Sequence, residues 1–201
     1  MAAQPATGPT PPDEELIRRT RTGEPEAFDR LVERYQRRAV SVSYRLVGNL
    51  HDALEISQDA FVRAYRGLAT LEDAQRFGAW FLRIVTNLSL NFRRSRATRG
   101  RTRSFEDCIL DDQGGADELV ADSPASEERP GARLAARELS EIVQRALADL
   151  PEPQRVALVL FSIEQMPQKD VAEILGCSVE AVKWHVFAAR KKLKERLADY
   201  V

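Results

Sequence analysis

A short turn near the C-terminus separates two segments of helical length. Pro167 opens the first segment, Gly176 and Cys177 form the turn, and Ser178 caps a longer helix that runs to about residue 198. The side of this helix opposite its apolar stripe carries Lys183, Trp184, Phe187, Arg190 and Lys191. A helix-turn-helix of this form can place its second helix in the DNA major groove, with early residues near base edges and late cations near phosphates.

The alternative for these side chains is a solvated basic face on an ordinary bundle helix. Trp184 and Phe187 argue against it, because two large aromatic side chains on a polar face indicate contact with a partner. The pattern therefore favours DNA binding by the last helix.

Catalytic residues do not occur in any convincing arrangement. The two histidines and two cysteines are widely scattered, which does not fit a zinc site. The sequence contains no glycine-rich phosphate loop, no Ser-His-Asp set and no metal-binding pair of carboxylates at a convincing spacing. His51 is interpreted as a solvated residue in the turn before a helix. The sequence thus predicts a binding protein that is not an enzyme and holds no metal or cofactor.

Length and composition fit one medium domain or two small ones. The 201 residues are 43% hydrophobic and 30% charged, which is enough apolar material for a core. No apolar stretch approaches the ~18 residues that cross a bilayer. The first residues lack the basic and apolar runs of a secretory signal, and two cysteines form no disulfide framework. A cytoplasmic location is expected.

The formal net charge of −1 hides an uneven distribution of charge. Residues 13–103 carry +6, residues 104–128 carry −9 without a single Lys or Arg, and residues 129–201 carry +2. Six arginines lie within residues 93–103. This asymmetry is a better guide to partners than the overall balance, and it separates an acidic segment from two more basic parts.

Apolar residues at spacings of three and four predict an all-α protein with two small helical domains joined by an acidic flexible linker. The expected divisions are a disordered tail, a first domain, the linker and a second domain, at residues 1–12, 13–103, 104–132 and 133–201. In the first domain, Asp52 is expected to cap a helix, and a loop over residues 67–75 precedes a helix over residues 76–96.

Two stretches of the chain resemble bacterial sigma factors. LPEPQRVALVLFSIEQMPQKDVAEILGCSVEAVKWHVFAARKKLKERL looks like their fourth domain. FDRLVERYQRRAVSVSYRLVGNLHDALEISQDAFVRAYRGL, followed by RFGAWFLRIVTNLSLNFRR, looks like their second domain. The possession of these two domains alone, in this order, resembles the extracytoplasmic-function (ECF) group of the sigma-70 family.

The resemblance implies a function and a set of partners. A sigma factor of this group binds core RNA polymerase, recognises an upstream promoter element by its helix-turn-helix and opens a downstream element. The implied partners are core RNA polymerase, promoter DNA and an anti-sigma protein. One alternative is a stand-alone helix-turn-helix transcriptional regulator, which leaves the first domain without a role. Another is a nucleic-acid enzyme, for which a metal site is missing.

The resemblance also assigns residues to three surfaces. Contact with core polymerase falls on a polar, net-acidic helix face formed by Asp52, Glu55, Gln58 and Asp59. The residues assigned to opening and reading the downstream element are Arg76, Phe77, Trp80, Arg83, Asn87, Asn91, Arg93 and Arg94. For Trp80, a core position is favoured over a stacking role. Recognition of the upstream element falls on Ser178, Lys183, Trp184, Phe187, Arg190 and Lys191. Strand opening needs flat side chains for unstacked bases and cations for the backbone.

Overall fold

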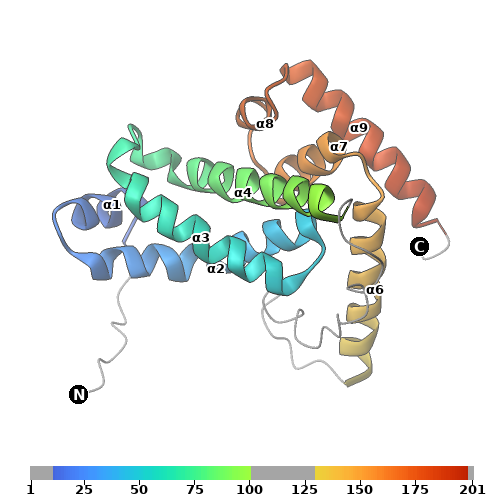
Figure 1. Cartoon of the computed structure of the whole chain (residues 1–201), viewed down its shortest axis with the longest axis horizontal. Coiled ribbons are helices and arrows are strands. Elements are labelled where there is room, and N and C mark those ends of the chain that lie inside the picture. Colours follow the sequence, from blue (N-terminus) through green and yellow to red (C-terminus); the bar gives the residue numbers. More distant parts are fainter. Residues whose placement is uncertain (1–10, 101–129, 199–201) are drawn as a thin grey trace.

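The structure, a computed structural model, describes the backbone of residues 11–100 and 130–198 and the side chains of residues 11–98 and 138–198. Within these ranges every regular element is helical, which confirms the predicted all-α class (Figure 1). The predicted tail (1–12) and acidic linker (104–132) fall almost entirely outside the described residues.

Four helices build the first lobe, which we define as residues 13–100. The short α1 (Asp13–Arg21) leads into α2 (Pro25–Val47), which ends at Gly48 with a φ of 83° in the left-handed region. α3 (Leu50–Gly67) and α4 (Phe77–Gly100) pack against α2 and against each other (Figure 1). The spacing of apolar residues predicted these helices well, because each buries one continuous stripe.

The start of α3 differs from the prediction. Asn49, not Asp52, is its N-cap, and the Asn49 side chain accepts a hydrogen bond from the backbone nitrogen of Asp52 at 2.9 Å. The helix therefore begins at Leu50, and His51 lies in its first turn instead of in a preceding turn. Asn and Asp both cap helices well, so the preference of Asp for this position did not by itself locate the start of the helix.

The segment predicted as a loop contains two single turns of 3₁₀-helix. These are η1 (Leu68–Thr70) and η2 (Ala74–Arg76), which leads directly into α4. The Arg21 guanidinium of α1 donates to the Leu68 carbonyl at 2.7 Å and thereby ties the segment to the lobe. Asp73 caps η2 by accepting from the backbone nitrogen of Gln75 at 2.9 Å. The segment is thus held at both ends.

Aromatic side chains fill the centre of the first lobe. Phe61 and Phe81 stack at 4.5 Å between ring centroids, and Phe77 stacks on Phe81 at 5.8 Å. Tyr35 meets Phe77 edge-on at 5.2 Å. These rings come from α2, α3 and α4, so the cluster fixes how the three helices pack.

The second lobe, residues 130–196, contains α6 (Pro130–Ala148), α7 (Glu152–Ala157), η4 (Leu158–Ile163), α8 (Gln168–Leu175) and α9 (Val179–Arg196). α7 continues directly into the π-helical η4, so the two form one helical segment. Periodicity does not distinguish a π-helical segment from an α-helical one over so few residues.

The predicted helix-turn-helix is present as α8, a turn and α9. Gly176 has a φ of 64° in the left-handed region, which is the conformation that favours glycine after a helix. Ser178 caps α9 by accepting from the backbone nitrogen of Ala181 at 3.1 Å. The regular part of α9 ends at Arg196, slightly earlier than expected.

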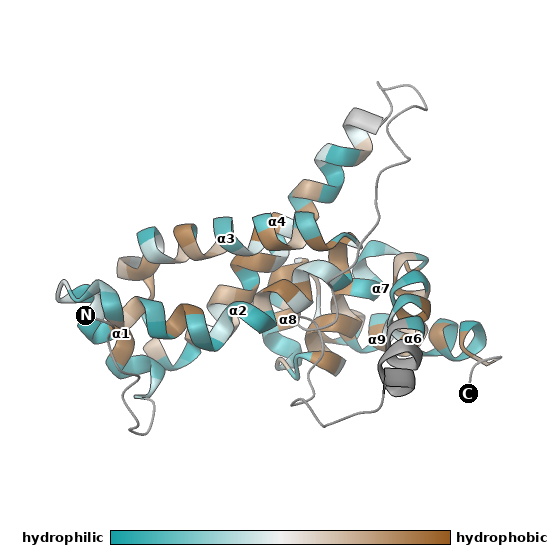
Figure 2. Cartoon of the chain, turned by 90° about the horizontal axis from the view of Figure 1, so that it is seen from below, coloured by the Kyte–Doolittle hydropathy of each residue, from teal (hydrophilic) through white to brown (hydrophobic). Residues whose placement is uncertain are grey.

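The two lobes pack directly against each other. One apolar cluster includes buried residues of the first lobe together with Val156, Leu160 and Val171 of the second, and Figure 2 shows apolar segments of both lobes meeting at the centre. Polar contacts continue this interface: the Gln144 amide donates to the Tyr44 carbonyl, at the end of α2, at 2.9 Å.

Arg155 is the most buried charged residue of this interface, with 4% of its surface exposed. Its guanidinium donates to the Leu46 carbonyl of the first lobe at 3.3 Å and to the Leu150 carbonyl of its own lobe at 3.1 Å. Burial, together with the nearby charge of Arg93, lowers the pKa of Arg155 to about 10. Arg155 therefore stays charged at neutral pH and binds the ends of helices from both lobes.

Among the described residues, no helix combines the length and the apolar character needed to cross a membrane.

Candidate polymerase- and DNA-binding surfaces

The predicted polymerase-binding face lies on α3. Glu55, Gln58 and Asp59 are exposed and project from neighbouring turns, because they are three or four residues apart. Asp59 accepts from Arg63 at 3.1 Å along the same helix. The face is thus solvated, polar and net acidic, as the sequence predicted, and a basic helical partner would complement it.

Asp52 stands at one end of this face and is less accessible. Its carboxylate accepts from Arg96 of α4 at 2.8 Å, and its side chain is only 18% exposed. The structure therefore places Glu55, Gln58 and Asp59 together, whereas Asp52 also joins α3 to α4.

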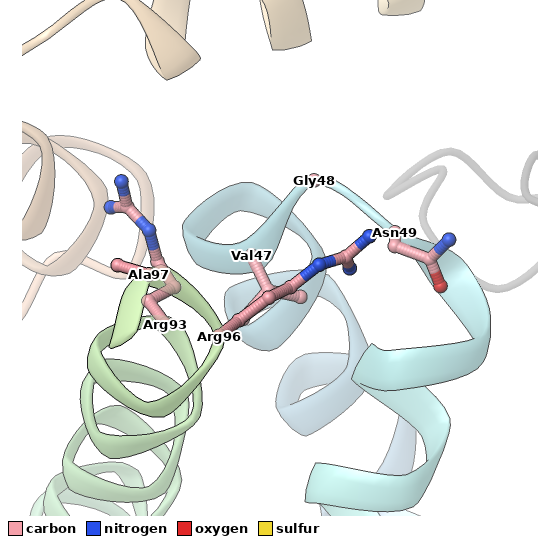
Figure 3. A pocket seen from close by; sticks show the side chains of 6 residues that line it. All are labelled: Val47, Gly48, Asn49, Arg93, Arg96 and Ala97. Atoms are coloured by element: carbon pink, nitrogen blue, oxygen red, sulfur yellow. The ribbon is translucent and has the colours of Figure 1, made fainter. Parts of the chain in front are cut away.

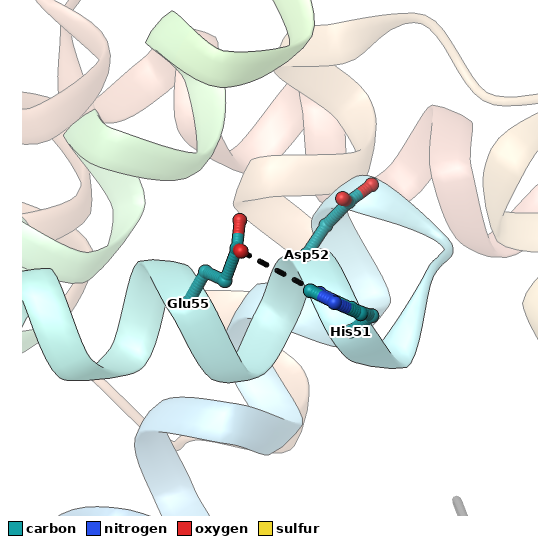
Figure 4. Close-up of side chains that lie close together, drawn as sticks. All are labelled: His51, Asp52 and Glu55. Atoms are coloured by element: carbon teal, nitrogen blue, oxygen red, sulfur yellow. Dashed lines mark ion pairs between the residues drawn. The ribbon is translucent and has the colours of Figure 1, made fainter.

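His51, Asp52 and Glu55 form a small group whose ligand-type atoms lie within 4.8 Å of one another (Figure 4). The ion pairs of the group account for this proximity. His51 Nδ1 lies 3.7 Å from a Glu55 carboxylate oxygen, and Asp52 is bound by Arg96. Exposed charges that already have partners are no evidence for a metal ion.

The predicted downstream-promoter residues follow α4. Six of them are spaced by three or four positions and form one stripe, which begins at the last residue of η2 and continues along α4, and which we call the α4 stripe: Arg76, Trp80, Arg83, Asn87, Asn91 and Arg94. All of these except the half-buried Trp80 are exposed. The ends of the stripe are 18 positions apart, so at a rise of 1.5 Å per residue the stripe is roughly 27 Å long. The regular spacing makes the stripe one continuous, mostly polar surface.

Phe77 and Arg93 lie outside the stripe. Phe77 is fully buried in the aromatic cluster and presents no ring face to solvent. Arg93 is half-buried, and its Nη1 atom has no hydrogen-bond partner within the described part of the chain. The prediction assigned both residues from their place in the stretch that carries the resemblance, whereas the helical rotation turns both away from the exposed face.

Trp80 occupies an intermediate position that fits both sequence interpretations. Its ring packs on the core beside Phe77, with centroids 5.8 Å apart. It also lines a pocket of about 310 Å³, which we call the loop pocket, together with Asp73, Arg76 and Arg83. The indole therefore packs partly on the core and also lines a polar pocket.

A second pocket, of about 320 Å³, lies where the end of α4 meets the start of α3 (Figure 3). Its lining includes Gly48, Asn49, Arg93 and Arg96. Figure 3 shows the two guanidinium groups pointing in different directions, with Arg96 reaching towards the start of α3. The structure thus adds Arg96 to the basic end of α4, a residue that the predicted site set did not include.

The predicted upstream-promoter residues share one face of α9. Lys183, Trp184, Phe187, Arg190 and Lys191 are all exposed, and Trp184 and Phe187 have 58% and 67% of their surface accessible. Val182, Val186 and Ala189 bury the opposite face. Ser178 acts as the helix cap, as described above, and it is also exposed.

The comparisons with known proteins agree with this geometry. The family model for sigma-70 region 2 matches residues 31–99, and the model for sigma-70 region 4 matches residues 140–193. The RNA polymerase sigma-H factor of Pseudomonas aeruginosa is 30% identical over 92% of this chain and 93% of its own length. The ECF RNA polymerase sigma factor SigW of Bacillus subtilis is 29% identical over 91% of this chain and 95% of its own length.

Solved structures show the same fold. CnrH, solved in complex with the cytosolic domain of CnrY, has a TM-score of 0.64 at 26% identity and covers 93% of this chain and 97% of that chain. The sigma factor RpoE of Bartonella quintana has a TM-score of 0.62 at 22% identity, covering 86% of this chain and 98% of that chain.

Two helical lobes that match sigma regions 2 and 4 in this order define a sigma-70-type transcription factor. The chain belongs to the ECF group of the sigma-70 family. Promoter-directed transcription initiation through RNA polymerase, predicted from the sequence, is thereby confirmed, and the stand-alone regulator is not favoured.

Proposed function

We propose that this chain binds core RNA polymerase through the exposed acidic face of α3 and contacts two promoter elements through α4 and α9. The observation that carries the proposal is the division of these surfaces among separate helices of one chain. An acidic face on α3, a polar stripe on α4 and a basic aromatic face on α9 are all exposed in the part of each helix that the structure describes. A stand-alone regulator would need only the last of these.

At the downstream element, the α4 stripe would hold the separated strand. The arginines of the stripe would bind phosphates, and Asn87 and Asn91 would donate to and accept from exposed base edges. Trp80 would offer a stacking surface at the loop pocket. Phe77 would support this surface from the core, since its ring lies beside Trp80.

At the upstream element, α9 would enter the major groove. Lys183 and Trp184 lie nearer the N-terminal end, where base edges are expected, and Arg190 and Lys191 lie further along, where phosphates are expected. Ser178 would position the helix through its cap and remain close to the backbone of the duplex.

The chain would act in the cytoplasm, where polymerase and DNA are found, and would catalyse no reaction itself. An anti-sigma protein is proposed as a further partner, supported by the sigma factor RpoE of Bartonella quintana, which is solved in complex with the anti-sigma factor NepR.

A binding titration separates this proposal from the stand-alone regulator. Labelled full-length chain is titrated with core RNA polymerase in the absence of DNA. Saturable binding is expected for a sigma factor, whereas a regulator that works only through α9 would bind duplex DNA but not core enzyme. Failure to bind core enzyme would reject the proposal.

A further inference from the structure

A group of charged side chains, which we call the arginine cluster, gathers where the end of α4 meets α3 and α7. Its members are Asp52, Arg93, Arg94, Arg96, Glu152 and Arg155. Both carboxylates already have partners, because Arg96 donates to Asp52 at 2.8 Å and Arg94 donates to Glu152 at 2.9 Å. Four positive and two negative side chains leave the cluster with a formal charge of +2.

Arg93 and Arg155 are the two members that have no carboxylate partner in the described part of the chain. The Nη1 atom of Arg93 and the Nε atom of Arg155 are both buried and have no hydrogen-bond partner among the described residues. After burial, the charge of Arg93 is the next largest cause that lowers the pKa of Arg155, and it outweighs the opposite effect of Glu152. Buried cationic donors without acceptors are unfavourable, so this pair is suited to an anion that offers several oxygens.

The pocket at the end of α4 opens the cluster to solvent. Arg93 and Arg96 line it together with Gly48 and Asn49, and its volume is about 320 Å³ (Figure 3). A water molecule takes about 30 Å³ of liquid volume, so a tetrahedral oxyanion with an attached group has room in the pocket. The start of α3 adds the positive end of that helix to the same pocket.

We propose that the arginine cluster is a binding site for a phosphate dianion, either inorganic phosphate or the phosphate monoester of a small metabolite. In this site Arg93 donates from Nη1 and Arg155 supplies the second positive charge. A phosphate monoester carries a charge of about −1.5 to −2 at pH 7 and three acceptor oxygens, so it balances the charge of the cluster. A backbone phosphate of DNA carries a single charge and balances only half of it. The site is separate from the surface proposed for promoter DNA, because Arg93 is turned away from the α4 stripe.

The first test measures binding to the full-length chain directly. Inorganic phosphate is followed by ³¹P NMR at constant ionic strength, and its line should broaden in a saturable way. We expect half-saturation at about 1 mM or below, since charge-assisted contacts hold the ion. Adenosine 5′-monophosphate is titrated in parallel, and whichever of the two dianions binds more tightly identifies the source of the phosphate group. Dimethyl phosphate, a diester with a single charge, should bind at least about tenfold more weakly than either.

The variant R93Q removes the less buried cation of the pair. Loss of a charge-assisted hydrogen bond should weaken phosphate binding about tenfold or more. In phosphate-free buffer R93Q should unfold at the same temperature as the unchanged chain or at a higher one, because a charge that repels Arg155 is gone. A purely structural role for Arg93 would lower the unfolding temperature instead. The matched control is R30Q, which makes the same charge change at an exposed arginine paired with Glu33 at 3.0 Å, and its phosphate affinity should be unchanged.

A chemical measurement locates the site without any substitution. Phenylglyoxal modifies arginine side chains, and peptide mapping gives the rate at each position. At about ten times the half-saturating concentration, phosphate should slow the modification of Arg93 about tenfold and leave that of Arg30 unchanged.

Saturable binding of a dianion that depends on Arg93 and protects it from phenylglyoxal supports the site. The proposal is overturned if phosphate binding does not saturate, if dimethyl phosphate binds equally well, or if R30Q weakens binding as much as R93Q. It is also overturned if R93Q unfolds at a lower temperature or if Arg93 is not protected. None of these measurements involves polymerase or promoter DNA, so the function proposed above is judged separately.

Discussion

Reversal of two charges on α3 should separate this chain from core RNA polymerase. The variant is E55R/D59R, at two side chains that are 64% and 48% exposed. Two opposite charges 4 Å apart in water attract by about 1 kcal/mol, so each reversal changes the interaction by about 2 kcal/mol. Because these side chains are solvated, the value for water applies. The two reversals together are expected to reduce the binding free energy by about 4 kcal/mol, which corresponds to about a thousandfold weaker binding.

The same variant has a small cost for the helix itself. Replacement of Asp59 removes the ion pair with Arg63 at 3.1 Å, and the arginine introduced at position 59 repels Arg63 one turn away. Such effects amount to about 0.2–0.5 kcal/mol for each pair. Thermal unfolding should therefore show that E55R/D59R remains folded, with stability reduced by about 1 kcal/mol or less.

The assay is a fluorescence titration of labelled chain with core enzyme at fixed salt. The control is E26R/E33R, which makes the same charge change on the exposed surface of α2, where Glu33 likewise pairs with a neighbouring arginine at 3.0 Å. Unchanged affinity in E55R/D59R would refute the assignment of the face. An equal loss in E26R/E33R would show that net charge, not the α3 face, governs binding.

Three further predictions concern DNA recognition and stability. Replacement of both Lys183 and Arg190 by alanine should weaken holoenzyme binding to the upstream element. Removal of a phosphate contact lowers the slope of affinity against salt concentration by about one per residue, whereas removal of a base contact reduces discrimination at one base position by about 1–3 kcal/mol. W80A should slow strand opening, because loss of the stacking contact with a base costs about 1–3 kcal/mol. The opening rate is measured with a fluorescent base analogue in the downstream element, and an unchanged rate would show that Trp80 is a core residue only. Burial and the hydrogen bond to Asp13 raise the pKa of Tyr35 in the folded chain, so the stability that protonated Tyr35 contributes is complete below the unfolded pKa of about 10 and is lost as pH rises above that value. Denaturant titrations above pH 10 should therefore show that the free energy of unfolding falls with pH less steeply for Y35F than for the unchanged chain, by up to about 1.4 kcal/mol per pH unit. Equal slopes for the two proteins would contradict this prediction.

Much of the local structure could be predicted because it depends on neighbours in the sequence. Apolar spacing located the helices, and Gly176 and Ser178 marked the turn and cap of the helix-turn-helix. The exposed members of the α3 and α9 faces were also predicted correctly as surface residues, since helical geometry fixes which side chains point away from an apolar stripe.

The packing of the lobes could not be predicted in the same way. Arg76 and Asp170 are 94 positions apart, and Arg155 and Leu46 are 109 positions apart. Acids such as Asp170 look like solvated surface residues when only their own helix is considered. The burial of Phe77 likewise depends on rings from other helices. These features follow from tertiary contacts that no local pattern encodes.

Transcription by reconstituted enzyme tests the central claim most directly. Core RNA polymerase is combined with the full chain and DNA of the source genome, and the 5′ ends of the transcripts are mapped. The account predicts discrete start sites that require the chain, share two upstream sequence elements at a fixed spacing and disappear with E55R/D59R but not with E26R/E33R. Transcripts that start at the same sites without the chain, or none with it, would contradict the assignment of this protein as a promoter-specificity factor.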